Sequence, residues 1–170
     1  LRTRCGAGLL PVRRWVQGGI HRQLDNYRAS AHVDTIVIQM TIDTACQITN
    51  GDLANSRVSL GRFRGVSIDT RTVRAGNAFF CLKGAQSDGH RFAPDARRRG
   101  AALIVADHAR ARRWRRWDVP VLGVDDPLTA LGDLAAVFRS CFPTRYIAVT
   151  GSVGKTTTKE LVAAALASKY

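Results

Sequence analysis

With 170 residues, the chain is long enough for one ordinary α/β domain and leaves little for a second. Its composition, 45% hydrophobic and 23% charged, is that of a globular protein, and no apolar run approaches the ~20 residues that cross a bilayer. We therefore expect no membrane insertion and a cytoplasmic location. The formal net charge of +13 is compatible with an anionic partner, either nucleic acid or a phosphate-rich small ligand.

Residues 1–39 differ from the rest of the chain. The stretch 1–23 is rich in arginine, contains no acidic residue and lacks the periodicity of a helix or a strand. Its composition would suit a transit peptide, and a weakly ordered extension that is not native is the simpler interpretation. Met40 is the only methionine, which leads to the hypothesis that the natural protein starts there. N-terminal sequencing of the native protein would test that hypothesis.

Residues 40–143 are expected to form a compact domain whose strands alternate with helices, which favours a mainly parallel sheet. The expected elements, in chain order, are a short helix closing at Asn50 and Gly51, strands at 66–68 and 78–82, a helix ending at Gly100, strands at 101–107 and 119–126, and a helix capped by Asp126 with Pro127 in its first turn. The apolar run at 101–107 predicts a strand covered on both faces. The last helix is expected to have one apolar face, made of Leu128, Leu131, Leu134, Ala135 and Phe138.

A dense basic run, RARRWRRW at 110–117, lies between two of these strands. It could be a nucleic-acid patch with interleaved aromatic residues, or a solvated helix face from which Trp114 or Trp117 packs inward. Nothing else in the chain resembles a nucleic-acid-binding module. We therefore favour the second interpretation and expect no nucleic-acid partner.

The four cysteines, Cys5, Cys46, Cys81 and Cys141, are widely scattered and form no CxxC pair. This spacing suggests neither a zinc site nor a disulfide framework. We expect buried free thiols.

The stretch TGSVGKTT at 150–157 indicates a phosphate-binding loop, because it follows an expected strand at 147–149 and precedes an expected helix. Gly151 and Gly154 would let backbone N–H groups approach an anion, and the helix N-terminus would add its positive dipole. Lys155 would bind the β- and γ-phosphates of a nucleotide, and the Thr156 hydroxyl would bind Mg²⁺. The loop thus predicts ATP and Mg²⁺ as cofactors, with Lys155 in a catalytic role and Thr156 as the metal ligand. The expected nucleotide-binding residues are Gly151, Ser152, Val153, Gly154, Lys155, Thr156 and Thr157.

The general P-loop pattern GxxxxGK[ST] is not fully satisfied, since its first glycine would fall on Val149. The shortened form TGSxGKT instead resembles the loop of the Mur ligase family, ATP-dependent enzymes that build the peptide stem of bacterial peptidoglycan. The upstream stretch 69–101 resembles the N-terminal domain shared by the MurE and MurF branches of that family, and the resemblance covers about residues 41–170. The pair Lys159 and Glu160 and the stretch FFCLKGAQSDGH fit the MurF branch, whereas Val153 departs from the Asn or Ser common at its position.

The resemblance implies an α/β fold in which a small substrate domain at 40–143 precedes the first strand, loop and helix of a central ATPase domain at 144–170, with that second domain truncated. It also assigns the UDP part of the substrate to the first domain. The motif-matching residues there are Asp69, Thr70, Arg71, Lys83, Gly84, Asp88, Gly89 and His90.

The function implied by the resemblance is the addition of D-Ala-D-Ala to UDP-MurNAc-tripeptide through an acyl phosphate, in a protein that is monomeric at full length. The 170 residues alone are expected to be inactive. Two alternatives stay open: a MurE-type ligase that adds a diamino acid or lysine to UDP-MurNAc-dipeptide, and a non-catalytic module that binds a UDP-sugar or nucleic acid.

Overall fold

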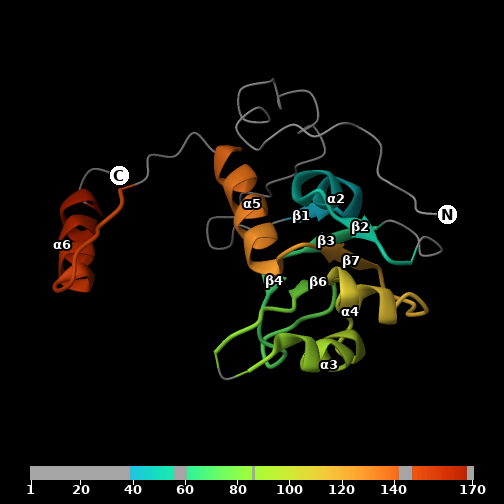
Figure 1. Ribbon diagram of the computed structural model, residues 1–170. Helices are drawn as coiled ribbons and strands as arrows, with labels where there is room; N and C mark the ends of the chain where they lie inside the picture. Colours follow the sequence, from blue (N-terminus) through green and yellow to red (C-terminus); the bar gives the residue numbers. More distant parts are fainter. Residues whose placement is uncertain (1–38, 56–60, 86, 142–146, 168–170) are drawn as a thin grey trace.

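The computed structural model describes residues 39–55, 61–85, 87–141 and 147–167 (Figure 1). The expected extension at 1–39 therefore lies outside the described residues except for Gln39. In chain order the elements are β1 (Gln39–Thr41), α2 (Ile42–Thr49), β2 (Asp52–Leu53), β3 (Arg62–Arg64), β4 (Val66–Ser67), β5 (Ala78–Phe80), the 3₁₀ turn η3 (Gly89–Phe92), α3 (Ala93–Arg98), β6 (Leu103–Asp107), α4 (His108–Arg113), β7 (Val121–Val124), α5 (Pro127–Ser140) and α6 (Lys155–Ala167).

A five-stranded, mostly parallel sheet forms the centre of the fold. Its order is β2-β7-β6-β5-β4, with β4 to β7 parallel to their neighbours and β2 antiparallel on the β7 edge. A separate antiparallel pair joins β1 to β3, with Met40 opposite Phe63. This arrangement confirms the predicted α/β class with a mainly parallel sheet.

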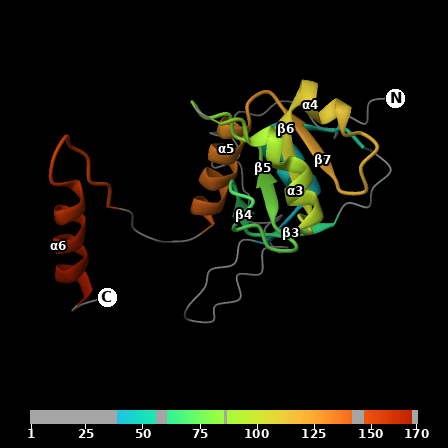
Figure 2. The same cartoon turned by 90° about the horizontal axis from the view of Figure 1, so that it is seen from below.

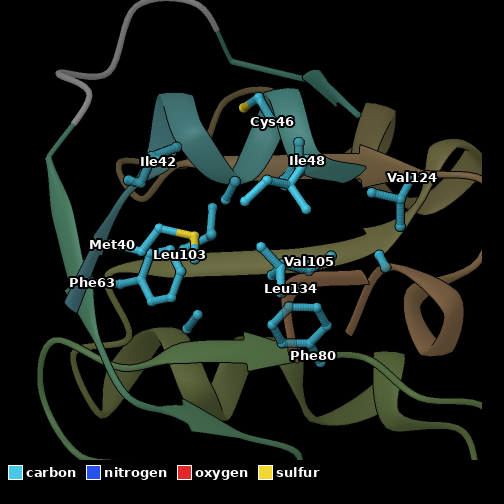
Figure 3. Close-up of a cluster of buried hydrophobic side chains, with 14 of the residues drawn as sticks. Met40, Ile42, Cys46, Ile48, Phe63, Phe80, Leu103, Val105, Val124 and Leu134 are labelled. Carbon is cyan, nitrogen blue, oxygen red and sulfur yellow. The ribbon is translucent and has the colours of Figure 1, made fainter. Parts of the chain in front are cut away.

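Each face of the sheet is covered by helices, and the alternation of side chains along the strands divides the core in two. Figure 1 shows α2 on one side of the strands and α3 and α4 on the other. In β6, Leu103 and Val105 join the cluster under α2 and α5, whereas Ile104 and Ala106 join the cluster under α3 and α4. Figure 3 shows the first cluster, where Ile48 of α2 points toward the strands. The apolar run of β6 is thus covered on both faces, as predicted.

Local sequence signals define most of the helix ends. The Thr41 side chain caps α2, and Asn50 ends it in the left-handed conformation at φ 49°. After α3, Gly100 adopts φ +82°, and the Gly100 and Ala101 amides donate to the carbonyls of Arg97 and Ala96. This pair of bonds is a Schellman motif, which needs a residue that tolerates positive φ. Asp126 caps α5 through the amides of Leu128 and Thr129.

The face of α5 was predicted only in part, since Leu134 is buried and Leu131 packs against the core, whereas Leu128 and Ala135 are exposed. The buried residues are Pro127, Ala130, Leu134 and Val137, and Leu128 is 62% exposed. Because α5 packs against both α2 and the sheet, the small side chain of Ala130 lies inward along with Leu134, whereas Leu128 at the start of the helix faces solvent.

The basic run forms α4 and the turn after it, between β6 and β7. Both Trp114 and Trp117 pack against the core cluster of that face, as the second interpretation of the run predicts. Of the cysteines, Cys46 and Cys81 are buried free thiols, Cys141 is only half-buried, which corrects its prediction, and Cys5 lies outside the described residues.

The C-terminal elements stand apart from this sheet (Figures 1 and 2). The strand expected at 147–149 is absent, which corrects that prediction, and none of the residues of α6 is buried. The physical reason is that no described strand lies beside 147–149 to pair with its backbone N–H and C=O groups. Within the described ranges, no helix is long and apolar enough to span a bilayer.

Candidate functional site

Four parallel strands, β4 to β7, end at one edge of the sheet, called here the carboxyl edge. In open α/β sheets, ligands bind in the crevice outside this edge. The expected substrate residues Asp69, Thr70 and Arg71 directly follow β4, and the segment from Lys83 to His90 follows its neighbour β5. The fold therefore brings the two predicted groups, separate in sequence, to adjacent positions at the carboxyl edge.

The turn after β4 is held by its own polar side chains. The buried Ser67 hydroxyl donates to the Asp69 carbonyl at 2.9 Å, and the Thr72 amide donates to the same carbonyl at 3.1 Å. These bonds fix the backbone that presents Asp69, Thr70 and Arg71 to solvent. Sequence patterns gave no sign that Ser67 and Thr72 support this turn.

Arg71 and Asp69 form an exposed ion pair. The Arg71 Nε lies 2.9 Å and its Nη2 lies 2.6 Å from Asp69 Oδ2. The hydrogen bond from Arg71 lowers the pKa of Asp69, and Asp69 in turn raises the pKa of Arg71. A guanidinium has five N–H donors, so the Nη1 donors of Arg71 stay available to a phosphate. The pair sets the direction of the guanidinium at the carboxyl edge.

The segment after β5 is a closed loop. Lys83 and Asp88 form a bridge, the Gly84 amide donates to the Ser87 carbonyl at 2.8 Å, and the Gly89 amide donates to the Leu82 carbonyl at 2.8 Å. Lys83 itself is exposed. A Cβ on Gly89 would lie 2.6 Å from the Leu82 carbonyl oxygen, so only glycine fits there without a backbone shift.

The side chains of Asp88 and His90 are held by protein partners, with His90 buried and Asp88 part-buried. The His90 ring is 5% exposed and lies between two aspartates. Its Nδ1 is 2.7 Å from Asp88 Oδ1, and its Nε2 accepts from the Asp107 amide at 3.3 Å. The accepting Nε2 makes Nδ1 the protonated nitrogen in the neutral ring, so Nδ1–H donates to Asp88.

Arg110 completes this network, and sequence reasoning missed it. Its Nη1 donates to Asp88 Oδ2 at 2.6 Å. That bond, together with those from His90, holds the pKa of Asp88 well below its usual range. The network ties the β5 loop to the end of β6 and to the start of α4, so Asp88 and His90 position the loop. In the sequence, Arg110 is one of several arginines in the basic run near the start of the helix after β6. Nothing in the sequence distinguishes it from the others.

The start of the expected phosphate-binding stretch, residues 150–154, is called here the Gly-rich loop; it is exposed throughout and precedes α6. Gly151 and Gly154 have φ of +147° and +80°, which a side chain would disfavour. The Lys155 ammonium contacts the Gly151 carbonyl and lies 3.5 Å from the Ser152 carbonyl. The Thr158 amide donates to the Gly154 carbonyl at 2.9 Å, so the amides ahead of it at the helix start have no intrahelical acceptor and are free to bind an anion. Ser152, Val153, Thr156 and Thr157 lie exposed along the same turn.

The loop thus offers helix-start amides, two glycines with positive φ and one exposed lysine, which are the groups that a phosphate-binding loop needs. The described residues contain no group of three His, Cys, Asp or Glu side chains placed to hold a metal ion. The sequence analysis predicts one Mg²⁺ ligand in this loop, the hydroxyl of Thr156, and that assignment stays a prediction.

Comparison with known proteins identifies the family. Residues 62–139 match the family described as "Mur ligase family, catalytic domain". The UDP-N-acetylmuramoyl-tripeptide–D-alanyl-D-alanine ligase of Bacillus subtilis (strain 168) is 37% identical over 141 residues, covering 79% of this chain and 29% of the relative. The chain belongs to the Mur ligase family.

Other Mur ligases are similar over shorter stretches. The UDP-N-acetylmuramoyl-L-alanyl-D-glutamate–2,6-diaminopimelate ligase of Mesorhizobium japonicum is 45% identical over 92 residues, covering 54% of this chain and 19% of the relative. Among solved structures, MurF from Acinetobacter baumannii has a TM-score of 0.67 at 29% identity, covering 78% of this chain and 28% of that one. MurF from Thermotoga maritima in complex with ADP has a TM-score of 0.54 at 35% identity, covering 61% of this chain and 23% of that one.

The chain therefore spans less than a third of the length of the Mur ligases it matches. The stretch that matches the family runs from β3 almost to the end of α5 and contains both groups of expected substrate residues. It ends before the Gly-rich loop.

Proposed function

We propose that this Mur ligase adds D-Ala-D-Ala to UDP-MurNAc-tripeptide, with the sheet binding the UDP part of the substrate and the Gly-rich loop binding ATP. The observation that carries the proposal is the meeting of the Asp69–Arg71 turn and the Lys83–His90 loop at the carboxyl edge. The two segments follow adjacent parallel strands, and α/β sheets bind ligands outside the carboxyl ends of such strands.

The chemistry at this edge suits a uridine diphosphate. Arg71 and Lys83 offer exposed cationic donors to a diphosphate, and Arg71 keeps its Nη1 donors unoccupied by Asp69. Ile68 and Phe92, in the segments after β4 and β5, are 55% and 41% exposed and would supply apolar surface for the base. Asp88 and His90 would act by holding the loop rather than by touching the substrate.

The Gly-rich loop would take the ATP phosphates on the open amides of α6. Lys155 would leave the carbonyls of Gly151 and Ser152 and pair with the phosphate oxygens, where its charge stabilises the transferring group. Bound Mg²⁺ would neutralise charge on the β- and γ-phosphates, and Thr156 is the residue proposed to hold it.

The proposed reaction has two steps. The tripeptide carboxylate attacks the γ-phosphorus and displaces ADP, which gives an acyl phosphate. The amine of D-Ala-D-Ala then attacks the acyl carbon, releases phosphate and loses a proton to form the amide. We propose that the complete protein does this as a cytoplasmic monomer without nucleic acid, and that these 170 residues alone do not, since they match only 29% of the Bacillus subtilis relative.

A MurE-type ligase is the second candidate, favoured by the 45% identity to the diaminopimelate ligase. That match covers only 54% of the chain, whereas the match to the D-Ala-D-Ala ligase covers 79%. We therefore place the MurF function first.

Two single variants of the complete enzyme test whether the Gly-rich loop acts in phosphoryl transfer and the carboxyl edge in binding of the UDP substrate. Lys155→Ala is expected to lower kcat by at least about 100-fold with the KM for UDP-MurNAc-tripeptide little changed, because its charge acts in phosphoryl transfer. Arg71→Ala is expected to raise the KM for UDP-MurNAc-tripeptide about tenfold with kcat nearly unchanged. Arg62→Ala, an exposed arginine on β3, is the matched control. If Arg71→Ala changes only the KM for ATP, the assignment of the carboxyl edge to UDP is wrong.

A further inference from the structure

A hollow of about 550 Å³ lies at the end of α4, lined by Arg112, Arg113, Arg115 and Arg116. It is called the arginine hollow here. The first two arginines are in the last turn of α4, and the other two are in the turn that follows. The hollow does not involve the residues of the carboxyl-edge site or of the Gly-rich loop.

In the part of the chain that the structure describes, the arginines of the hollow lack the acidic partner that several nearby arginines have. Arg110 binds Asp88 at 2.6 Å, Arg97 binds Asp118 at 2.7 Å, and Arg98 pairs with Asp95. Across the described ranges, no carboxylate forms a salt bridge with the four arginines of the hollow. The α4 dipole favours cations in its last turn, but Arg115 and Arg116 lie beyond that turn. Four like charges gathered without a partner are stabilised by an anion that binds among them.

The backbone under the hollow is held firmly. Trp114 and Trp117 stack with ring centroids 4.7 Å apart and planes at 13°, and both pack against the core. Asn55, buried in the fold, donates to the carbonyls of Trp117 and Val119 at 3.0 and 2.6 Å. The Arg97 guanidinium lies 5.2 Å from the Trp117 ring centroid. The arginines thus project from a fixed base, which lowers the entropy lost when they close on a ligand.

The packing of Trp114 and Trp117 favours a small anionic ligand over single-stranded nucleic acid. Single-stranded nucleic acid binds through aromatic rings on which its bases stack, but Trp114 and Trp117 are stacked on each other and packed inward. The four guanidinium groups gather at one open hollow rather than spreading over a face of the molecule, which suits a compact polyanion better than an extended lipid surface.

We propose that the arginine hollow binds a small ligand with two or more linked phosphate groups, either inorganic polyphosphate or a nucleoside polyphosphate. Each guanidinium can donate two parallel hydrogen bonds to one phosphate group. Linked phosphates carry about three to four negative charges in a short span, which a single carboxylate or orthophosphate does not, and this charge matches the four arginines of the hollow. This site is separate from the proposed function and does not depend on it.

Calorimetric titration of the chain with inorganic tripolyphosphate tests the proposal. Because the Gly-rich loop and the carboxyl edge would also take a polyphosphate, all proteins carry Lys155→Ala and Arg71→Ala. Tripolyphosphate is expected to bind, and the added pair Arg115→Ala and Arg116→Ala to weaken binding by about tenfold or more. The pair Arg62→Ala and Arg64→Ala removes the same charge from exposed positions on β3 and is expected to weaken it less than about threefold. Circular dichroism confirms that each variant is folded.

The comparison of ligands then identifies the source of the phosphates. Tighter binding of ATP than of tripolyphosphate assigns the hollow to nucleoside polyphosphates, and equal binding assigns it to inorganic ones. The proposal is overturned if tripolyphosphate does not bind, or if the β3 pair lowers affinity as much as the pair in the hollow. It is also overturned if a single-stranded oligonucleotide or phosphatidylglycerol vesicles bind through Arg115 and Arg116 while tripolyphosphate does not.

Discussion

Replacing Asp88 by alanine tests how the loop at the carboxyl edge is held. Asp88 accepts from Arg110 Nη1 at 2.6 Å, from His90 Nδ1 at 2.7 Å and from the His90 amide at 3.1 Å. In Asp88→Ala, the Nδ1–H of a ring that is 5% exposed loses its acceptor, which costs about 1–3 kcal/mol. Loss of the cap on η3 adds about 1 kcal/mol.

The free energy of unfolding should therefore fall by about 2–4 kcal/mol, measured by urea denaturation. For a chain of this size, the melting temperature would fall by roughly 4–16 °C. Asp95→Ala removes an exposed aspartate of α3 and should change the free energy by less than about 0.5 kcal/mol. A cycle with His90→Ala should give a coupling energy of about 0.5–3 kcal/mol. A loss below about 0.5 kcal/mol in Asp88→Ala, or strict additivity with His90→Ala, would refute the reasoning.

The effect of pH on the stability that Asp88 contributes follows from its lowered pKa. Its carboxylate stays charged in the folded state at pH values where the unfolded chain already binds a proton, so the stabilisation is present above about pH 4 and is lost as the pH falls below it. The difference between the native chain and Asp88→Ala should therefore shrink between about pH 4 and pH 2. A difference that grows in this range would contradict the hydrogen bonds from Arg110 and His90 as its cause.

Two further predictions concern packing and thiol reactivity. Gly89→Ala should destabilise the chain by about 1–3 kcal/mol because its Cβ would meet the Leu82 backbone, whereas Gly132→Ala, with open space around it inside α5, should stabilise it by about 0.5–1 kcal/mol. Urea denaturation of both variants checks the pair, and equal effects would contradict the close approach at Gly89. Burial raises the pKa of the Cys81 thiol, so iodoacetamide at pH 8 should label half-buried Cys141 faster than Cys81. Peptide mass mapping over time measures both, and faster labelling of Cys81 would contradict its burial.

The parts of the fold that could be predicted are those specified by neighbouring residues. The apolar run of β6, the Asp126 cap and the turn at Asn50 are local signals, and the structure contains all three. The two groups of residues expected to bind substrate each occupy one short motif, and the parallel sheet places both motifs at one edge, while their role in binding stays a prediction.

The parts that could not be predicted depend on partners distant in sequence. Arg110 contacts Asp88 across 22 residues, and Asn55 accepts from the Val121 amide across 66 residues. The face of α5 depends on how closely it meets α2, which hydrophobicity alone does not reveal. The strand expected at 147–149 shows the same limit, because a strand exists only where another strand pairs with it.

Phosphate release from ATP and Mg²⁺ by the complete protein containing this chain tests the central proposal most directly. One reaction contains UDP-MurNAc-tripeptide with D-Ala-D-Ala, and the other contains UDP-MurNAc-dipeptide with a diamino acid. We predict turnover in the first reaction only, and mass spectrometry should show a product heavier than the substrate by the dipeptide less one water. Turnover in the second reaction only would contradict the proposal and assign the chain to a MurE-type ligase.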